Sequence, residues 1–527
     1  MLRIGRKGLL LALLTALAAT SFTAAAFGGG KELVIAKSRE ALALDPQDIS
    51  DTPSEEINHA IYEGLVTFDE KLNIVPMLAK EWSHSEDGLE WTFKLKEGIA
   101  FHSGTPFDAK AVKVNFDRIL NGKYKRTSLY APVIEEVSVV DDHTVKFTLK
   151  ESFGPFLNVL AHTAGLILDP SYVQDPKKNE SIKHRPSGTG PFMLDEWEQG
   201  DYIALKANKK YWQGEPKIDR LVFRTVPEDS ARAMMIETGE VDIAEQIPPT
   251  DVERLGKNKR IDMKVLPSIV VQFVGVNCQN EVLKDPAVRR ALAYSIDRQA
   301  ICDKILLGYA EPVNSMVAPL VNGYSEVSGF TYDPEKAKAI LEEAGWADSD
   351  GDGIRDKDGK KLTVEFWTHG RDTLSLKVPQ AVQSFASAVG FDCKMKVMDW
   401  GAFLAATRKP VEESTSQLMW LGWSPSTGDA DWVYRPLVHS DYWQPKGPNR
   451  PFYSNETVDE YIMIGFHSVD QDERREAYRK AQEILNQELP WIPLYSRKTL
   501  HAFSKKLEKV EYLPLDFVVI SHETDKK

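Results

Sequence analysis

Two carboxylates stand among large aromatic side chains in one short stretch of the sequence. The stretch contains two aspartates and three aromatic residues: Asp429, Asp431, Trp423, Trp432 and Tyr434. Carboxylates between aromatic faces suit a partly dry pocket that takes one cationic group. The chemistry that these residue types offer is therefore binding of an ammonium group. The competing interpretation is a surface loop in which the tryptophans pack and the aspartates cap turns.

The residues before this stretch indicate how it is held. Residues 418–421 form an apolar run of the kind that a buried strand uses, and Gly422, Pro425 and Gly428 then interrupt regular structure. Binding residues are often carried by loops on a rigid scaffold. We therefore expect a strand that ends in a ligand-binding loop.

No pattern of catalytic or metal-binding residues accompanies this loop. The sequence lacks His-Glu-x-x-His, Gly-x-Ser-x-Gly, a Walker lysine and Cys-x-x-Cys, and its eleven histidines are scattered. The sequence therefore predicts a protein that is not an enzyme and has no cofactor and no metal site. A secreted hydrolase whose triad forms only in space is the alternative that spacing does not detect.

An acidic loop is the strongest candidate for a metal site. Asp348, Asp350, Asp352 and Gly353 match the first half of an EF-hand calcium loop. Gly359 stands where that loop needs a bidentate glutamate. We favour a plain turn, with calcium binding as the alternative.

The N-terminus has the three-part layout of a secretory signal peptide. Residues 1–26 begin with three basic side chains, continue as an apolar run over residues 8–19 and close with alanines at 24–26. No later run approaches the roughly 20 apolar residues that a spanning helix needs. No cysteine near the cleavage site invites a lipid anchor. We expect a soluble protein exported to the periplasm.

Charge and length narrow the function classes further. The chain of 527 residues carries a net charge of −13, and loss of the signal peptide removes three basic groups. This balance argues against nucleic acid and against an anionic membrane surface as partners. The mature length of about 500 residues predicts two or three domains. Three widely spaced cysteines, Cys278, Cys302 and Cys393, predict buried thiols and no disulfide framework.

Strand and helix patterns alternate along the rest of the chain. Residues 91–95 and 145–149 alternate apolar and polar side chains, with a helix expected from residue 106, which predicts a small α+β lobe. Further on, strands are expected at 222–226, 240–244, 362–367, 392–397 and 491–495, with helices at 230–238, 333–344, 377–389 and 470–490. Such alternation predicts a mixed sheet with helical cover.

Several short motifs occur in a characteristic order. They are Ile-Tyr-Glu-Gly-Leu at 61–65, Pro-Met-Leu-Ala-Lys-Glu-Trp at 76–82, Trp-Thr-Phe-Lys-Leu-Lys-Glu-Gly at 91–98, Phe-His-Ser-Gly at 101–104, Gly-Thr-Gly-Pro-Phe at 188–192 and Val-Arg-Arg-Ala-Leu-Ala-Tyr-Ser-Ile-Asp at 288–297. In this order they resemble the peptide/nickel class, family 5, of extracytoplasmic solute-binding proteins that serve ABC importers. The resemblance spans nearly the whole mature chain.

The resemblance implies an α/β protein of two α+β lobes, the periplasmic-binding-protein fold, with a small inserted domain and a ligand enclosed at the hinge. It places the boundaries as follows: signal peptide 1–26, lobe I 27–72, inserted domain 73–186, lobe I again 187–272, lobe II 273–490 and a C-terminal return to lobe I at 491–527. It also implies that the protein is not catalytic.

The resemblance further implies ligand-binding residues. In the dipeptide and oligopeptide binders, an acidic residue after a Gly-Trp strand end takes the ligand ammonium, and we match it to Asp429. In the dipeptide-type members, an arginine after the earlier strand takes the carboxylate, and the matching position is Arg371. Trp423 falls where relatives place an aromatic wall, and Trp432 and Tyr62 complete the expected site. The pair of opposite charges would anchor a zwitterion in a closing cleft.

The expected function is capture of small peptides, di- or oligopeptides or glutathione, for delivery to ABC permease subunits in the inner membrane. Residues 426–437 are similar to the corresponding stretch of glutathione-binding members. The nickel branch fits less well, since residues 160–165 lack the arginine that nickel-chelate binders place nearby. A binder of a metal chelate or opine, and a sensor docking subunit, are the alternatives within the class. We expect a monomer.

Overall fold

The computed structural model describes residues 30–370 and 374–527. The signal peptide expected at residues 1–26 lies outside the described residues. Among those that are described, no helix is both long and apolar enough to cross a membrane. Cys302 and Cys393 are buried and Cys278 is half-buried, and all three are free thiols.

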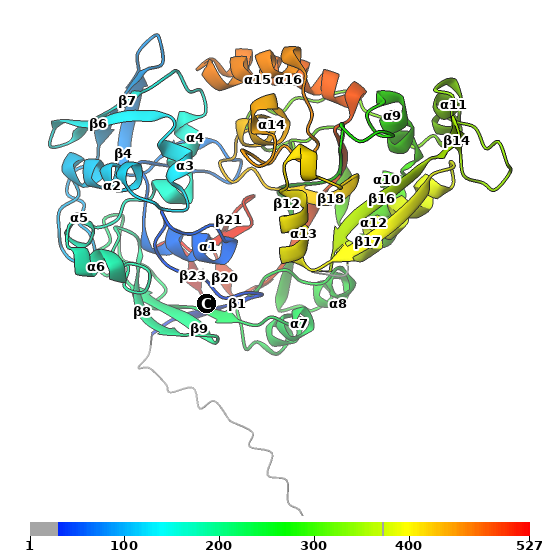
Figure 1. Cartoon of the computed structure of the whole chain (residues 1–527). Helices are drawn as coiled ribbons and strands as arrows, with labels where there is room; N and C mark the ends of the chain where they lie inside the picture. Colours follow the sequence, from blue (N-terminus) through cyan, green and yellow to red (C-terminus); the bar gives the residue numbers. More distant parts are fainter. Residues whose placement is uncertain (1–29, 371–373) are drawn as a thin grey trace, which may run out of the picture.

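One mixed sheet runs through the whole molecule. In spatial order its strands are β17 (Asp392–Met398), β16 (Thr363–His369), β18 (Leu418–Trp423), β12 (Ile261–Val276), β19 (Trp491–Ser504), β11 (Ile243–Ala244), β1 (Glu32–Lys37), β10 (Arg220–Thr225), β9 (Tyr202–Ala207) and β8 (Phe192–Glu198), and β13 (Ala310–Pro312) pairs with β19. We call the part around β8 to β11 and β1 lobe I, and the part around β16 to β18 lobe II. The two lobes lie at opposite ends of this sheet (Figure 1).

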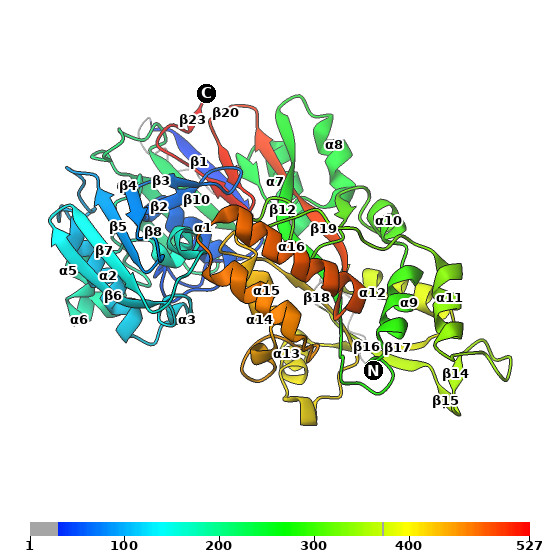
Figure 2. The ribbon, with the colours of Figure 1, turned by 90° about the horizontal axis from the view of Figure 1, so that it is seen from above.

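The long strands β12 and β19 connect the two lobes. They pair antiparallel from Ile261 opposite Ser504 to Gly275 opposite Trp491, and their register shifts between Pro267 and Val271. Near one end β11 of lobe I pairs with β19, and near the other end β18 of lobe II pairs with β12. Figure 2 shows the two strands side by side through the middle of the molecule. A register shift within a paired ladder is where a sheet bends, so this point is the expected hinge.

A second, smaller sheet forms the small domain. It consists of β4 (Ala79–His84), β5 (Glu90–Leu95), β7 (Thr144–Leu149) and β6 (Ile134–Asp141), with α2 (Ala109–Asn121), α3 (Thr127–Tyr130) and α4 (Phe156–Ala161). The alternation expected over residues 91–95 is observed, because Trp91, Phe93 and Leu95 are buried. Asp108 caps α2 by accepting a hydrogen bond from Ala111 N at 2.8 Å. The boundaries of this domain at residues 73 and 186 stay a prediction.

Helices cover both lobes. In the first half of the chain these are α1 (Thr52–Ile61), α5 (Pro170–Val173), α6 (Pro176–Ser181), α7 (Asp229–Thr238) and α8 (Val252–Gly256). Lobe II carries α9 (Pro286–Ser295), α10 (Arg298–Ala300), α11 (Pro334–Glu343), α12 (Leu374–Ser387), α13 (Trp400–Thr407), α14 (Asp431–Val438), α15 (Glu456–His467) and α16 (Gln471–Glu488). Short hairpins are β2 (Val66–Phe68) with β3 (Ile74–Pro76), β14 (Asp356–Lys357) with β15 (Lys360–Lys361), β20 (Leu507–Glu508) with β23 (Asp525–Lys526), and β21 (Glu511–Leu513) with β22 (Phe517–Val519).

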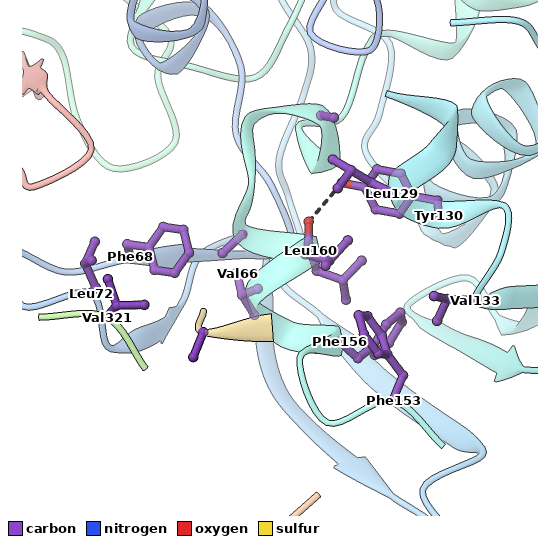
Figure 3. Packing of buried hydrophobic residues seen from close by; sticks show 14 of the residues in the cluster. Val66, Phe68, Leu72, Leu129, Tyr130, Val133, Phe153, Phe156, Leu160 and Val321 are labelled. Carbon is purple, nitrogen blue, oxygen red and sulfur yellow. Dashed lines mark hydrogen bonds between the residues drawn. The ribbon is translucent and has the colours of Figure 1, made fainter. Parts of the chain in front are cut away.

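The largest apolar core passes from the small domain into lobe II. Figure 3 shows the part around α4, where Phe153 and Phe156 lie beside Val133, and Val321 of lobe II reaches toward Leu72. The rings of Phe153 and Phe466 stand 4.9 Å apart across the boundary. Gly154 N donates to Phe466 O at 2.8 Å at the same place. The small domain and lobe II therefore form a continuous contact in this structure.

Candidate functional site

A cavity of about 320 Å³ lies between the lobes. One wall comes from the N-terminal part of the chain and its C-terminal return: Ser50, Thr52, Glu55, Arg126, Thr163, Leu515 and Phe517. The facing wall comes from lobe II: Gly422, Trp423, Ser424, Ser426 and Trp432. This volume stands at the lower end of the usual range for small-ligand sites, about 300 to 1,000 Å³. The cavity is therefore sized for a small molecule that both lobes contact.

The end of β18 and the loop after it make the lobe II wall. Residues 418–421 form the buried strand that the sequence predicts, extended to Trp423, where β18 ends. Trp423 Nε1 donates to Trp432 O at 2.7 Å and ties the strand end to the start of α14. The structure thus brings Trp423 and Trp432 together at the cavity, as expected. Their contact with a ligand stays a prediction.

The carboxylate of Asp429 faces the interior of lobe II. It is fully buried and forms an ion pair with Arg474, with Nη2 2.7 Å from Oδ1 and Nη1 3.0 Å from Oδ2. Asn322 Nδ2 and Asp431 N donate to the same carboxylate. Asp429 does not line the cavity. Arg474 therefore neutralises the charge of Asp429 within lobe II, away from the cavity.

Asp431 has its own partner in the first turn of α14. Its two oxygens accept from Arg435 Nε at 2.8 Å and Nη2 at 2.7 Å, and Arg435 Nη1 donates to Tyr442 Oη. This ion pair raises the pKa of Arg435 against the lowering effect of burial. Asp431 and Arg435 line a second cavity of about 300 Å³ between the small domain and lobe II, which shares Trp432 with the first.

The structure does not bring the other two expected site residues, Tyr62 and Arg371, together with Trp423 and Trp432 among its described residues. Tyr62 is buried in the core of lobe I, where its hydroxyl donates to Leu44 O at 3.0 Å, and it lines neither interlobe cavity. Arg371 lies outside the described residues. Their roles in ligand binding stay predictions.

Sequence reasoning missed the charged pair on the opposite wall. Arg126 Nη2 lies 2.5 Å from Glu55 Oε1, and Arg126 Nε donates to Ile49 O at 2.9 Å. Burial raises the pKa of the Glu55 carboxyl, and Arg126 opposes the rise. Glu55 stands in the first turn of α1, whereas Arg126 is the residue before α3. No local spacing could have paired two residues so far apart in the sequence.

A half-buried histidine beside this wall gives a pH-dependent prediction. His59 Nε2 lies 3.1 Å from Thr163 Oγ1, its ring packs against Phe517, and burial lowers its pKa to about 4. The unfolded chain, with a histidine pKa near 6.5, takes the proton first as the pH falls. The stabilising effect of the neutral ring is therefore complete above pH 6.5 and is lost between pH 6.5 and about 4.

His59→Gln removes this titration and retains hydrogen-bonding capacity toward Thr163. We expect the difference in free energy of unfolding between variant and wild type to be constant above pH 7. Toward pH 4 it should move in favour of the variant by up to about 3 kcal/mol. Urea denaturation at pH 7.5, 6 and 4.5 checks this. A difference that does not change with pH contradicts the assignment of the lowered pKa.

The acidic loop is organised by hydrogen bonds of its own. Lys361 Nζ contacts Asp350 at 2.7 Å and Asp352 at 3.0 Å, and Asp348 accepts from Gly351 N and Gly353 N. The three carboxylates are exposed and lie within 4.8 Å of one another. These contacts describe the turn that we favour, with a lysine already beside two of the carboxylates. Calcium binding stays an untested alternative.

Comparison with known proteins agrees with this architecture. Residues 73–445 match the family model of bacterial extracellular solute-binding proteins, family 5, middle region. The glutathione-binding protein GsiB of Escherichia coli K12 is 36% identical over 500 residues, which cover 94% of this chain and 95% of that protein.

Solved structures show the same arrangement of lobes. The oligopeptide-binding protein AppA of Bacillus subtilis, in complex with a nonapeptide, has a TM-score of 0.77 and 28% identity, covering 94% of this chain and 99% of the other. The ABC transporter-associated periplasmic binding protein DppA of Helicobacter pylori, in complex with the peptide STSA, has a TM-score of 0.75 and 26% identity, covering 94% and 98%. The two-lobed fold class expected from the sequence is confirmed.

Proposed function

Because the chain belongs to the bacterial extracellular solute-binding proteins of family 5, we propose that it captures a small peptide between its lobes and delivers it to the permease subunits of an ABC importer. The cavity between lobes I and II is the observation that carries this proposal. Walls from both lobes let one ligand stabilise the closed arrangement, which is how hinged binders recognise cargo.

The cavity has the chemistry that a small peptide needs. Trp423 and Trp432 supply aromatic surface that tolerates different side chains, and Ser424 and Ser426 supply hydroxyl groups on the same wall. Glu55 and Arg126 supply both signs of charge opposite them. A zwitterionic guest with some apolar surface fits this combination better than a purely apolar or purely anionic one.

We propose glutathione or a closely related peptide as the cargo. Support comes from the relatives named as glutathione-binding, which are 36% identical over nearly the whole chain.

We further propose that the protein acts in the periplasm after cleavage of residues 1–26, that it is monomeric and that it catalyses no reaction on its cargo. Calorimetric titration with glutathione, an α-linked dipeptide and nickel with histidine tests the cargo class. Binding of the nickel complex alone overturns the peptide assignment.

Trp423→Ala tests whether the cavity is the ligand site. We expect a 10- to 100-fold weaker Kd for glutathione, because truncating a central aromatic anchor typically costs about 2 kcal/mol or more. Trp82→Ala is the matched control, since Trp82 lies in β4 of the small domain and lines neither interlobe cavity. Isothermal titration calorimetry measures both. An unchanged Kd for Trp423→Ala would exclude this cavity as the site.

A further inference from the structure

We infer, on the basis of the proposed function, that Glu55 and Arg126 recognise an amino acid head group whose ammonium and carboxylate are on the same carbon. The cargo is therefore a γ-glutamyl peptide, of which glutathione is one, and not an ordinary α-linked peptide. This inference depends on where charge lies in the cavity, on the free hydrogen-bonding positions of the two side chains, and on the separation of charges in the two kinds of peptide.

Among the described residues, the charged side chains that line the cavity lie side by side. Of the described residues that line it, Glu55 and Arg126 are charged, and the remainder are hydroxyl-bearing, aromatic, aliphatic or glycine residues. The carboxylates nearest the facing wall, Asp429 and Asp431, are each held by an arginine of lobe II. The described part of the site thus offers a carboxylate and a guanidinium side by side, with uncharged groups opposite.

Both members of the pair retain hydrogen-bonding capacity. Arg126 uses Nε on Ile49 O and Nη2 on Glu55, whereas Nη1 has no hydrogen-bond acceptor within the described parts of the chain. From the described residues, the Glu55 carboxylate accepts a hydrogen bond through Oε1, and Oε2 remains available. Behind them, Asp51 Oδ1 caps α1 and its buried Oδ2 has no partner among the described residues. A carboxylate can therefore join Arg126, and an ammonium can join Glu55 and the negative field of Asp51.

The spacing of the pair selects the kind of peptide. Arg126 Nη2 and Glu55 Oε1 are 2.5 Å apart, so the two sites offered to a ligand are adjacent. In an α-linked dipeptide the terminal charges are separated by two residues of chain, roughly 5 to 7 Å when extended. A γ-glutamyl peptide carries its free ammonium and free carboxylate on one carbon, because the peptide bond uses the side-chain carboxyl. Only the γ-glutamyl peptide can therefore place its ammonium at Glu55 and its carboxylate at Arg126 at the same time.

Two isomers separate these cases. γ-Glutamylalanine and its α-linked isomer glutamylalanine have the same composition and net charge and differ only in which carboxyl group forms the peptide bond. We expect the wild-type protein to bind the γ-linked isomer at least 10-fold more tightly in calorimetric titration. Arg126→Gln and Glu55→Gln should each weaken binding of the γ-linked isomer and reduce this preference below about 3-fold.

Matched variants separate specificity from loss of structure. Lys125→Gln removes the exposed positive charge next to Arg126 and should retain the full preference. Trp423→Ala should weaken binding of both isomers by similar factors, because its wall does not contact the head group. Circular dichroism melts of all variants verify folding, and if Arg126→Gln fails to fold, Glu55→Gln, which retains the guanidinium, decides the question.

Each outcome has a distinct meaning. Equal affinity for the two isomers, or preference for the α-linked one, overturns the head-group inference and leaves peptide capture intact. A preference that persists in both Arg126→Gln and Glu55→Gln overturns the assignment of this pair. No binding of glutathione or of either isomer to the wild-type protein overturns the inference together with the proposed cargo.

Discussion

Asp429→Asn lowers the free energy of unfolding by about 3 to 5 kcal/mol. The substitution leaves the guanidinium of Arg474 fully buried without its carboxylate partner, and breaking a buried pair from one side has a cost of this order. The carboxylate accepts from Arg474 at 2.7 and 3.0 Å, whereas the other recorded acceptors of this guanidinium, Gly465 O and Gln471 Oε1, carry no net charge. Urea denaturation at neutral pH, followed by intrinsic fluorescence, measures the change.

Two further variants test the explanation. Asp429→Leu combined with Arg474→Met removes both charges and should recover most of the lost stability, because well-packed apolar residues often replace a buried pair at little cost. Glu476→Gln breaks the partly exposed contact with Arg479 and should change stability by less than about 1 kcal/mol. If Asp429→Asn has wild-type stability and yet loses glutathione binding, Asp429 is a ligand residue, as the sequence suggested.

Gly154→Ala should prevent the lobes from reaching the arrangement seen here. A Cβ built at Gly154 lies 2.0 Å from Ser468 O, a backbone atom of lobe II, and 2.8 Å from Arg474 Nε. Backbone on the opposite side of the contact cannot rotate away as a flexible side chain can, so the small domain and lobe II must separate. We expect glutathione affinity to fall at least 10-fold and the ligand-bound radius of gyration, measured by small-angle X-ray scattering, to increase.

Gly256→Ala is the matched control for this substitution. Its added Cβ lies 3.9 Å from Met263 Cγ, an ordinary contact, and the position is in α8, remote from the boundary between the small domain and lobe II. If Gly154→Ala retains wild-type affinity and unchanged scattering, the added methyl group meets no obstacle in the ligand-bound protein. The small domain and lobe II would then be apart at Gly154 when ligand is bound.

The elements that could be predicted from the sequence are those with local signals. The apolar run at residues 418–421 became β18, and Asp108, Asp285 and Asp470 each accept backbone hydrogen bonds at a helix start. Capping and periodicity depend on neighbours within a few residues, so a sequence displays them directly. The order of short motifs was likewise sufficient to identify the family.

The candidate site was less accessible because its chemistry depends on distant partners. The sequence shows Asp429 beside aromatic residues, but it does not show that Arg474 of α16 reaches back to neutralise it. The stretch after Asp429 also folds as helix α14 from Asp431, whereas we expected irregular structure there. The Glu55 and Arg126 pair joins α1 to the small domain, and neither residue stands in a recognisable motif.

The central strand β19 is synthesised after each of the long-range partners that it pairs with. Since β11, β12 and β13 all pair with it, neither half of the molecule has a complete sheet until residues 491–504 have been made. A chain that stops at Pro490 would present unpaired edges from both halves at once, which invites aggregation. The order of synthesis alone thus makes the pairing of both lobes wait for one late segment of the chain.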